Sequence, residues 1–325
     1  MLAALYDRHG PAGEVLRVED VVRPEPGPGE VRVRVSVAGV NPTDWKARAG
    51  ATGGSLDVPF QVPGQDGAGT IDAVGPGVDD DRIGQRVWLY FAARGRQWGT
   101  AAQWTVVPEG QAVPLPDSAS DDLGASLGIP AITAHHCLFA DGPIDGRTVL
   151  IAGGAGAVGH AAIELARRAA ARVVATVSSE DKARLADAAG AHAVVNYRAA
   201  DASEQVRAAA PAGVDRVVEL ALDQNLELDL AACAPHAVIS VYADSGGEPS
   251  LPVRRLMVPN VTLRFVLVYT IPERALKVAV AGVREALAAG ALTTLPLHRF
   301  PLERTAEAHD AVEQGALGKV VIDVP

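Results

Sequence analysis

The feature that most restricts how this chain can fold is a glycine-rich turn between an apolar strand and a helix. Val149–Ala152 is a short apolar run, Gly153–Gly159 follows with the sequence GGAGAVG, and a helical pattern extends from about 158 to 171. In this strand–turn–helix context, GxGxxG is the fingerprint of a βαβ unit that binds a dinucleotide. A glycine-rich turn without a ligand is the alternative interpretation.

Each glycine of the fingerprint has an expected role. Gly154 is expected to allow the tight turn, Gly156 to let the backbone approach a pyrophosphate, and Gly159 to let the helix pack close to the strand. The free N–H groups and the dipole at the helix start then favour an anion. The turn therefore predicts a dinucleotide-binding domain.

The end of the next strand bears on which dinucleotide is bound. An NAD site usually has Asp or Glu there, to hold the ribose 2′-OH. Here Val173–Val177 ends in Ser178 and Ser179, and Lys182 follows in the next helix. Two acidic residues between them fall in the first helical turn, where acids also serve capping. The pattern favours a 2′-phosphate and hence NADP; a Lys182 on a solvated helix face is the alternative.

The length of the chain and the change in its pattern of strands and helices predict two domains. With 325 residues the chain exceeds the roughly 250–300 that one core usually serves. Residues 1–124 are rich in short strands, and Val31–Val37 alternates strictly between apolar and polar residues. Residues 125–296 alternate short apolar strands with alanine-rich helices, which is typical of a doubly wound parallel sheet. Residues 297–325 contain a short helix and a final strand, and we expect them to rejoin the first domain.

Expected strands and helices follow from these patterns. The strands are expected at 31–37, 69–74, 87–92, 103–107, 149–152, 172–177, 193–195, 214–220, 237–241, 262–268 and 319–324. The longer helices are expected at 158–171, 181–189, 273–289 and 305–314. Few segments of residues 1–124 are expected to be helical.

Composition excludes several classes of function. The formal net charge is −10, which argues against a nucleic-acid binder because such proteins need a basic surface. The sequence contains no run of 18 apolar residues, so no membrane span is predicted. The two cysteines, Cys137 and Cys233, form no disulfide framework, and a reducing cytoplasm is expected.

A metal site is not expected either. The histidines and cysteines show no short-spaced cluster of the kind that structural zinc requires. The adjacent His135 and His136 are expected at a helix surface or a domain interface. Without a Lewis acid or an evident base, alcohol oxidation is disfavoured. Reduction of an already electrophilic acceptor, a quinone or an enone, needs less help from the protein.

Several motifs together resemble one family. They are Pro24–Val31, Ala38–Lys46 (AGVNPTDWK), Pro63–Gly69 (PGQDGAG), Gly128–Ala134 (GIPAITA) and the Gly154–Gly159 turn. With them the chain resembles the zinc-independent quinone oxidoreductase (zeta-crystallin-like) branch of the medium-chain dehydrogenase/reductase superfamily. Zinc relatives carry Cys and His where this chain has Gly39 and Gln65.

The resemblance implies a fold in which a doubly wound Rossmann sheet is inserted in a GroES-like β-barrel catalytic domain. The catalytic domain would be 1–124, completed by 297–325, and the NADP-binding domain would be 125–296. The chain as a whole is then of the α/β class.

The resemblance also implies site residues. The implied cofactor contacts are Ala155, Gly156, Ala157 and Val158 for the pyrophosphate, Ser178, Lys182 and Tyr197 for the adenosine phosphates, Asn225, Tyr242 and Ala243 beyond later strands, Phe265, Val266 and Leu267 near the nicotinamide amide, and Lys319 near the chain end. Asn41 and Thr133 match polar groups near the nicotinamide. Several relatives have tyrosine where Lys46 stands, and a lysine there could bind the substrate oxyanion, bind cofactor phosphates or point to solvent.

Structural alternatives accompany these assignments. Tyr197 could cover a loop, Phe265 could belong to the core, and Lys319 could lie on a solvated strand edge. Asn41 could form a turn before Pro42, and Thr133 could cap a helix.

The sequence therefore predicts an NADPH-dependent quinone reductase that transfers a hydride without a metal. An NADPH-dependent 2-alkene (enone or enoyl) reductase is the first alternative, and an NADPH-binding sensor or structural protein with little turnover is the second. The expected partners are a small-molecule quinone or enone and a second copy of the chain. A homodimer through the strand at Thr262–Val268 would cover an edge that otherwise needs protection.

Overall fold

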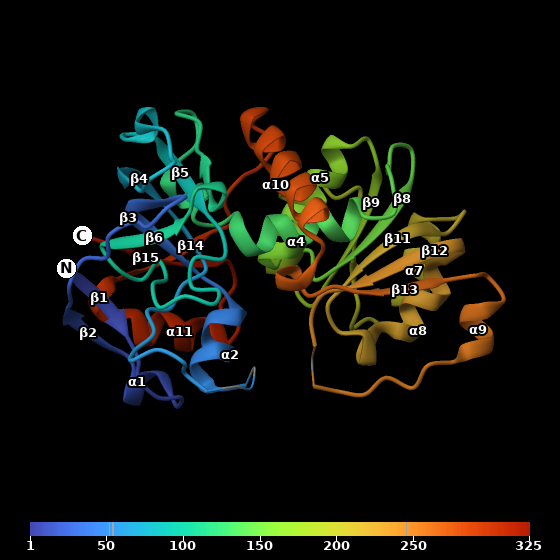
Figure 1. Ribbon diagram of the computed structural model, residues 1–325. Helices are drawn as coiled ribbons and strands as arrows, with labels where there is room; N and C mark the ends of the chain where they lie inside the picture. Colours follow the sequence, from blue (N-terminus) through green and yellow to red (C-terminus); the bar gives the residue numbers. More distant parts are fainter. Residues whose placement is uncertain (52, 54, 245) are drawn as a thin grey trace. The chain divides into compact units, whose positions relative to one another are not determined.

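The computed structural model of the protein describes residues 1–325 except Thr52, Gly54 and Ser245. The chain divides into two compact units. Unit 1 comprises Met1–Ile129 and Thr294–Pro325, and unit 2 comprises Pro130–Thr293. Both chain ends belong to unit 1, as the blue and red ends of the ribbon in Figure 1 show. None of the helices in the described part of the chain combines the length and hydropathy that a bilayer-spanning segment needs.

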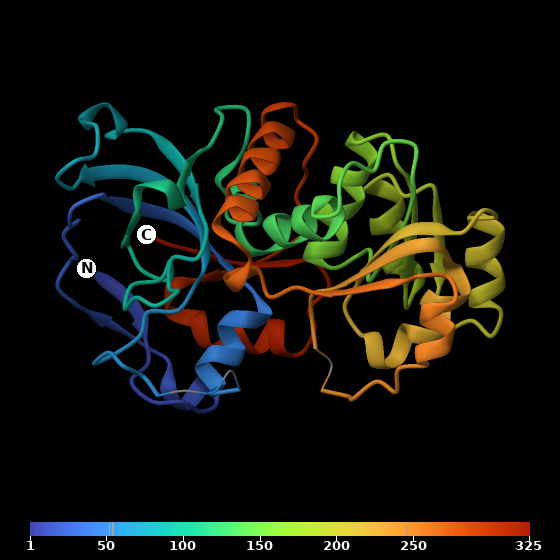
Figure 2. The same ribbon diagram turned by 45° about the vertical axis from the view of Figure 1, so that its right-hand side comes forward.

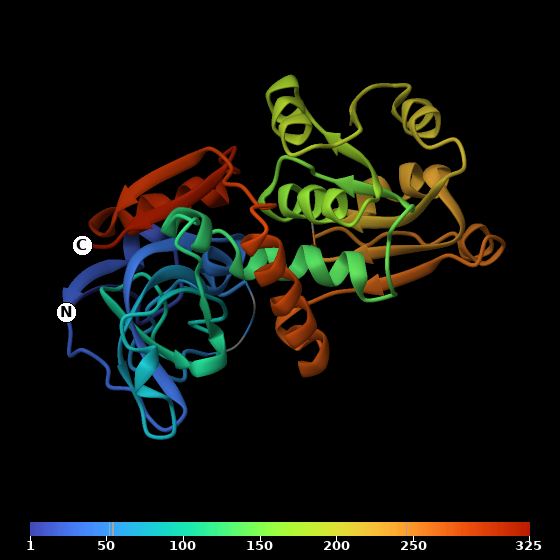
Figure 3. The same ribbon diagram turned by 90° about the horizontal axis from the view of Figure 1, so that it is seen from above.

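Unit 2 is built on a parallel sheet (Figure 3). Its strands among the described residues are β8 (Thr148–Ala152), β9 (Arg172–Val177), β10 (Ala193–Asn196), β11 (Val214–Glu219), β12 (Cys233–Val241) and β13 (Thr262–Phe265). They pair in parallel in the order β10-β9-β8-β11-β12-β13. Counted within the unit this is 3-2-1-4-5-6, the order of dinucleotide-binding sheets, and ligands of such sheets bind beyond the carboxyl ends at the switch between β8 and β11. The predicted doubly wound parallel sheet is confirmed.

Helices connect these strands, because parallel neighbours cannot be joined by a tight hairpin. The connecting helices are α5 (Ala157–Arg168), α6 (Glu180–Ala188), α7 (Ala202–Ala209), α8 (Leu222–Ala232) and α9 (Val253–Met257). Helix α4 (Gly128–Phe139) precedes β8, and the short 3-10 helix η3 (Val268–Thr270) and α10 (Glu273–Ala288) follow β13. The strands read as apolar runs because both faces of the sheet are covered. Val149, Leu150 and Ile151 of β8, for example, are completely buried.

Unit 1 contains a largely antiparallel sheet. Its strands among the described residues are β3 (Glu30–Val40), β4 (Asp66–Val74), β5 (Arg86–Leu89), β6 (Trp104–Pro108), β7 (Ala112–Pro114), β14 (Leu297–Pro301) and β15 (Lys319–Asp323). The order is β14-β15-β3-β4-β5-β7, and β6 also pairs with β3. The last strand, β15, pairs antiparallel with β3, so that Val320 lies opposite Val40. A separate pair consists of β1 (Leu2–Leu5) and β2 (Arg17–Asp20).

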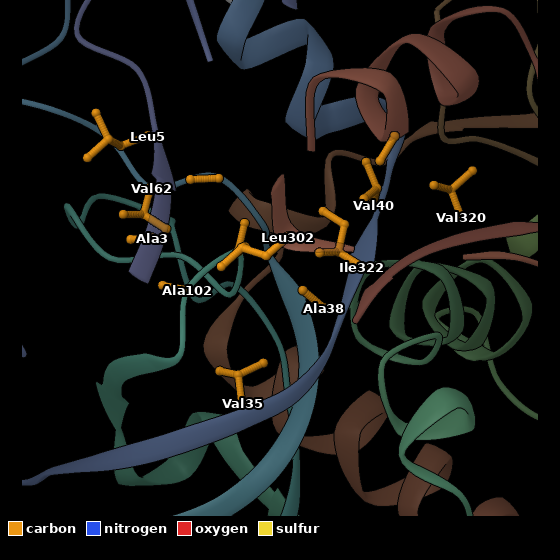
Figure 4. Close-up of a cluster of buried hydrophobic side chains, with 13 residues drawn as sticks. Ala3, Leu5, Val35, Ala38, Val40, Val62, Ala102, Leu302, Val320 and Ile322 are labelled. Atoms are coloured by element: carbon orange, nitrogen blue, oxygen red, sulfur yellow. The ribbon is translucent and has the colours of Figure 1, made fainter. Parts of the chain in front are cut away.

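The core of unit 1 joins distant parts of the chain. Figure 4 shows Leu5, Val35 and Ala38 from the first 40 residues beside Leu302 and Ile322 from the chain end. The helices of the unit are α1 (Ala12–Val15), α2 (Pro42–Ala49), α3 (Asp121–Gly124), α11 (Thr305–Glu313) and the 3-10 helices η1 (Asp80–Arg82), η2 (Glu109–Gln111) and η4 (Leu302–Arg304). Helices α2 and α11 lie side by side in Figure 2.

Several elements differ from the sequence-based expectation; for example, β12 begins at Cys233 and β5 ends at Leu89. Asn41 is the N-cap of helix α2 rather than only a turn residue, because Pro42 occupies the first helical position and Asp44 completes a capping box. Strand β13 ends at Phe265, three residues before the predicted end, because the chain then turns into η3.

Candidate functional site

The glycine-rich turn follows the carboxyl end of β8. Glycine is required at several of its positions, for a different physical reason at each. Gly153 has the left-handed φ of 65° that the tight turn needs, whereas the sequence pattern predicts Gly154 for this role. A Cβ on Gly154 would lie 2.9 Å from the Cβ of Ala175, so this glycine lets β9 pack against the turn. A Cβ on Gly159 would lie 2.2 Å from the carbonyl oxygen of Gly153, so Gly159 lets α5 approach the turn closely.

Gly156 differs from these three because it is exposed. It is the N-cap of α5, with φ −81° and ψ 163°, and a Cβ there would meet only Gly153 O, at 3.3 Å. The first turn of α5 contains no acidic residue, while the first N–H groups of a helix lack intrahelical acceptors and carry the positive end of its dipole. Ala155 is buried, and Ala157 and Val158 are partly exposed. An anion can therefore approach the backbone at Gly156.

A second group of polar residues lies at the ends of β9 and β10. The Nζ of Lys182 in α6 donates a hydrogen bond to Ser178 Oγ at 3.0 Å. Ser179 caps α6, because its Oγ accepts from Lys182 N at 3.4 Å. The N–H of Tyr197 donates to Val177 O at 3.0 Å, so Tyr197 lies beside the end of β9. The predicted 2′-phosphate residues are thus neighbours at one edge of the sheet.

A further cation lies in this group. The guanidinium carbon of Arg198 is 5.9 Å from the centroid of the Tyr197 ring, and Arg198 is exposed. Asp181, an acid in the first turn of α6, already forms an ion pair with Arg184. Lys182 and Arg198 therefore place two cations near the end of β9, beside the acids Glu180 and Asp181 at the start of α6.

Three further predicted cofactor residues, Asn225, Tyr242 and Val266, lie along the same edge of the sheet. Asn225 Nδ2 in α8 donates to Glu219 Oε1 at 2.9 Å, and Glu219 is the last residue of β11. The N–H of Tyr242, directly after β12, donates to Glu219 O at 3.0 Å. Burial raises the pKa of the Tyr242 phenol, which therefore stays protonated. The N–H of Val266 donates to Val241 O at 2.8 Å.

Other predicted residues have exposed or helical positions. The side chains of Phe265 and Leu267 are 68% and 57% exposed, so a cofactor contact there would use the backbone. Ala243 is exposed. Thr133 is buried inside α4, five residues after the helix start, so it does not cap that helix.

In unit 1, Asn41 and Lys319 belong to one buried polar network. Lys319 Nζ donates to Asn41 Oδ1 at 2.7 Å and to Val40 O at 3.2 Å. Asn41 Nδ2 donates to Asp66 Oδ2 at 2.7 Å, and the Asn41 N–H donates to Asp44 Oδ2 at 2.8 Å. The structure thus brings together two predicted site residues and two carboxylates that the sequence reasoning missed.

Asp44 and Asp66 are buried, and their pKa values are raised above those of ordinary carboxyl groups. Asp44 and Asp66 are 3% and 0% exposed. Burial and the neighbouring Asp66 raise the pKa of Asp44 to about 7, and burial raises the pKa of Asp66 to about 6. Burial also lowers the pKa of Lys319, against the attraction of both carboxylates. The network can therefore hold or release a proton near neutral pH, while its lysine limits how far the carboxyl pKa values rise.

Lys46 lies outside this network. It is partly exposed on α2, and its Nζ is 5.9 Å from the centroid of the Trp45 ring. Its role in binding an acceptor stays a prediction.

Comparisons with known proteins identify the family of the chain. Residues 27–117 match the family described as "Alcohol dehydrogenase GroES-like domain", and residues 157–281 match "Zinc-binding dehydrogenase". The chain is 28% identical to the quinone oxidoreductase of Rattus norvegicus, over 98% of this chain and 96% of that protein. It is 31% identical to a 2-haloacrylate reductase from Burkholderia, over 95% and 94% of the two chains. The chain belongs to the quinone oxidoreductase (zeta-crystallin-like) branch of the medium-chain dehydrogenase/reductase superfamily.

Solved structures of this superfamily extend the likeness. A mycobacterial protein complexed with NADPH is 29% identical, with a TM-score of 0.85 and coverage of 99% of both chains. The predicted fold class, a Rossmann sheet with a GroES-like domain, is confirmed. Membership in this branch also makes the chain an oxidoreductase, as the sequence predicts.

One family name refers to zinc, and the residues present do not fit a zinc ion. The resemblance described above implies a cysteine near Gly39 in zinc relatives, and a Cβ on Gly39 would lie 2.0 Å from the carbonyl oxygen of Ala125. Gln65 stands at the histidine position, and its N–H donates to Asp44 Oδ1 at 3.1 Å. Among the residues that the structure describes, no group of three or more His, Cys, Asp or Glu could hold a metal.

Sequence reasoning missed Asp44, Asp66, Glu219 and Arg198. Asp44 had a usable signal, because Asn-Pro-x-Asp is a helix start with a capping residue at the third position. Asp66 stands inside the Pro63–Gly69 motif, where no residue type or spacing marks it as buried. Glu219 and Arg198 had only their places at the end of β11 and just after β10.

Proposed function

We propose that the protein is an NADPH-dependent reductase. The observation that carries this is the polar group at the end of β9, where Ser178, Lys182 and Tyr197 lie together and no carboxylate ends the strand. A ribose 2′-OH would need an acid there, whereas a 2′-phosphate needs cations and hydroxyls. The NADPH complex of the mycobacterial relative supports this choice. A bound reduced nicotinamide would supply the hydride.

The acceptor we propose is a quinone. Relatives of this branch are named quinone oxidoreductases, and the residues at Gly39 and Gln65 offer no ligands for a Lewis acid. A quinone needs none, because its conjugated ring delocalises the charge that the hydride brings. The protein's task is then to bind and orient both reactants.

An alkene reductase is the second candidate. The 2-haloacrylate reductase from Burkholderia is 31% identical over almost the whole chain. Hydride transfer to a conjugated alkene leaves an enolate that requires a proton donor. Lys46 on the exposed side of α2 is the residue of this chain that we propose for that position.

We further propose that the protein acts in a reducing compartment such as the cytoplasm and forms a homodimer. Strand β13 is the last strand of the unit 2 sheet in the described residues, and Phe265 and Leu267 at its end are largely exposed. An apolar strand edge of this kind needs a cover.

The activity test compares cofactors and acceptors in steady state. NADPH should give a kcat/KM at least about tenfold above NADH with a benzoquinone, since one hydrogen bond between charged groups corresponds to about that factor. Turnover of an enone with none of a quinone would favour the alkene reductase. Tight NADPH binding without turnover of either acceptor would identify a sensor or structural protein.

Two glycines of the turn allow a matched test of pyrophosphate binding. Gly156→Ala should lower the thermal stability less than Gly159→Ala does, because its Cβ would lie 3.3 Å from Gly153 O and replaces only an N-cap glycine, but it should weaken NADPH and NADH roughly tenfold alike. Gly159→Ala should instead destabilise the fold by about 1–3 kcal/mol, because its Cβ would lie 2.2 Å from Gly153 O. Calorimetry and titration of both cofactors measure the two effects. Unchanged binding in Gly156→Ala would contradict the predicted approach of the pyrophosphate.

A further inference from the structure

Two completely buried carboxyl groups lie at the carboxyl end of β11 and in the helix α8 that follows it. Glu219 ends β11 and Asp229 lies in α8, and both are 0% exposed. Glu219 uses a single oxygen for its donors: Oε1 accepts from Leu220 N at 2.7 Å, from Asn225 Nδ2 at 2.9 Å and from Ala221 N. No group of the described residues donates to Glu219 Oε2 or to either oxygen of Asp229.

The two side chains nevertheless interact directly with each other. Two carboxylates are both acceptors, so only a proton carried by one of them can join the pair. Burial raises the pKa of both groups, and the neighbouring Glu219 raises the pKa of Asp229 further. Two buried carboxyl groups in contact cannot both ionise at moderate cost.

The surroundings supply no compensating cation within the described residues. Tyr242 after β12 and Cys233 at its start face the pair, and burial keeps both neutral by raising their pKa values. Helix α7 also packs against α8, but its charged residues Glu204 and Arg207 are exposed. A proton between the two carboxyl groups is therefore the available compensation.

The pair connects to three parts of the candidate cofactor edge. Asn225 and Asp229 are spaced i,i+4 on α8 and therefore share a helix face. Leu220, whose N–H is held by Glu219, packs so close to the turn that a Cβ on Gly153 would lie 2.5 Å from its Cδ2. The carbonyl of Glu219 accepts from Tyr242 N at 3.0 Å. Movement of the Glu219 carboxylate would disturb Asn225 and Leu220, which it binds directly.

We infer that Glu219 and Asp229 share one proton and act as a positioning pair that holds Asn225 and Leu220 in place beside the dinucleotide turn. The role assigned to Asn225 rests on the proposed NADPH function, whereas the shared proton does not. Asp229 in this arrangement is the acid that donates to Glu219 Oε2, and Glu219 is the anion that accepts four hydrogen bonds.

The test compares an apolar and an amide replacement of the acid. Asp229→Leu removes the donor and leaves Glu219 Oε2 buried without a partner, which should weaken NADPH binding roughly tenfold and lower the Tm. Asp229→Asn supplies an N–H in place of the O–H and should restore most of both losses. Infrared spectra at about pH 8.5, above the pKa of about 7 of Asp44, should show a protonated carboxyl band in the wild type that disappears in Asp229→Asn.

Each outcome is decisive for the pair. An Asp229→Asn protein as impaired as Asp229→Leu, or a wild type without the protonated band, overturns the shared proton. If Asp229 variants do not fold, Glu219→Gln keeps Oε1 for its donors and offers an N–H to Asp229, and it should likewise lose the band and retain NADPH binding. If the wild type does not bind NADPH at all, the proposed function fails, while the band and the Tm order still test the pair.

Discussion

Replacement of Lys319 with methionine is expected to lower the free energy of unfolding by about 3–5 kcal/mol at about pH 8, because it removes the cation of a buried charge network. Lys319 is 3% exposed and donates to Asn41 Oδ1 at 2.7 Å. Its ammonium group lowers the pKa of Asp44 and of Asp66 against the effect of burial. Without this ammonium group, the two buried carboxyl groups lose the positive charge that stabilises their ionised forms.

The pH dependence of this loss separates charge from packing. Unfolded aspartate releases its proton near pH 3.9, whereas the folded pKa values are about 6 for Asp66 and about 7 for Asp44. Between these limits the folded state binds more protons, so wild-type stability falls as pH rises through the window. Loss of Lys319 moves the folded pKa values higher. The difference between variant and wild type should therefore be small near pH 4 and grow through neutral pH.

Chemical denaturation at about pH 4.5 and pH 8 measures this difference. Lys46→Met is the control, because Lys46 in the same unit is partly exposed and stands apart from the network, so its removal should change stability by less than about 0.5 kcal/mol. An equal loss for Lys319→Met at both pH values would mean that the lysine contributes packing alone. The charge network would then be refuted.

The fold could be predicted from the sequence where burial imposes a simple pattern. Strands such as Thr148–Ala152 are covered on both faces, so they read as apolar runs, and the alternation of Val31–Val37 reflects buried valines between the exposed Arg34 and Ser36. Helix α2 was missed because its eight residues, PTDWKARA, show little apolar periodicity. Its start was nevertheless encoded locally, in the capping residues Asn41 and Asp44.

The candidate site was predictable only in its local parts. The turn at Gly153–Gly159 and the pair Ser178 and Lys182 each lie within a few residues of chain, where spacing carries information. The residues of the buried polar networks, by contrast, lie far apart in the sequence. Asn41 and Lys319 are 278 positions apart, and nothing in either segment alone indicates that their side chains meet. Periodicity shows which apolar residues a fold buries, but not which polar groups it buries with them.

Replacement of Lys182 with alanine should weaken NADPH binding by about 10- to 150-fold and leave NADH nearly unchanged, because one charge-assisted hydrogen bond contributes about 1.5–3 kcal/mol. Lys182 Nζ lies 3.0 Å from Ser178 Oγ at the end of β9, where the 2′-phosphate is proposed to bind. Arg198→Ala should have a smaller effect in the same direction, because this exposed guanidinium lies over the Tyr197 ring.

The control for Lys182→Ala is Lys277→Ala, which removes the same charge from another helix of unit 2, where Lys277 pairs with Glu273 at 2.7 Å. It should change neither cofactor's affinity. Titration of NADPH and NADH at two salt concentrations adds a second criterion, since salt screens the attraction between a lysine and a phosphate that stay accessible to solvent. Equal weakening of both cofactors in Lys182→Ala would refute the 2′-phosphate role, because the two cofactors differ only in that group.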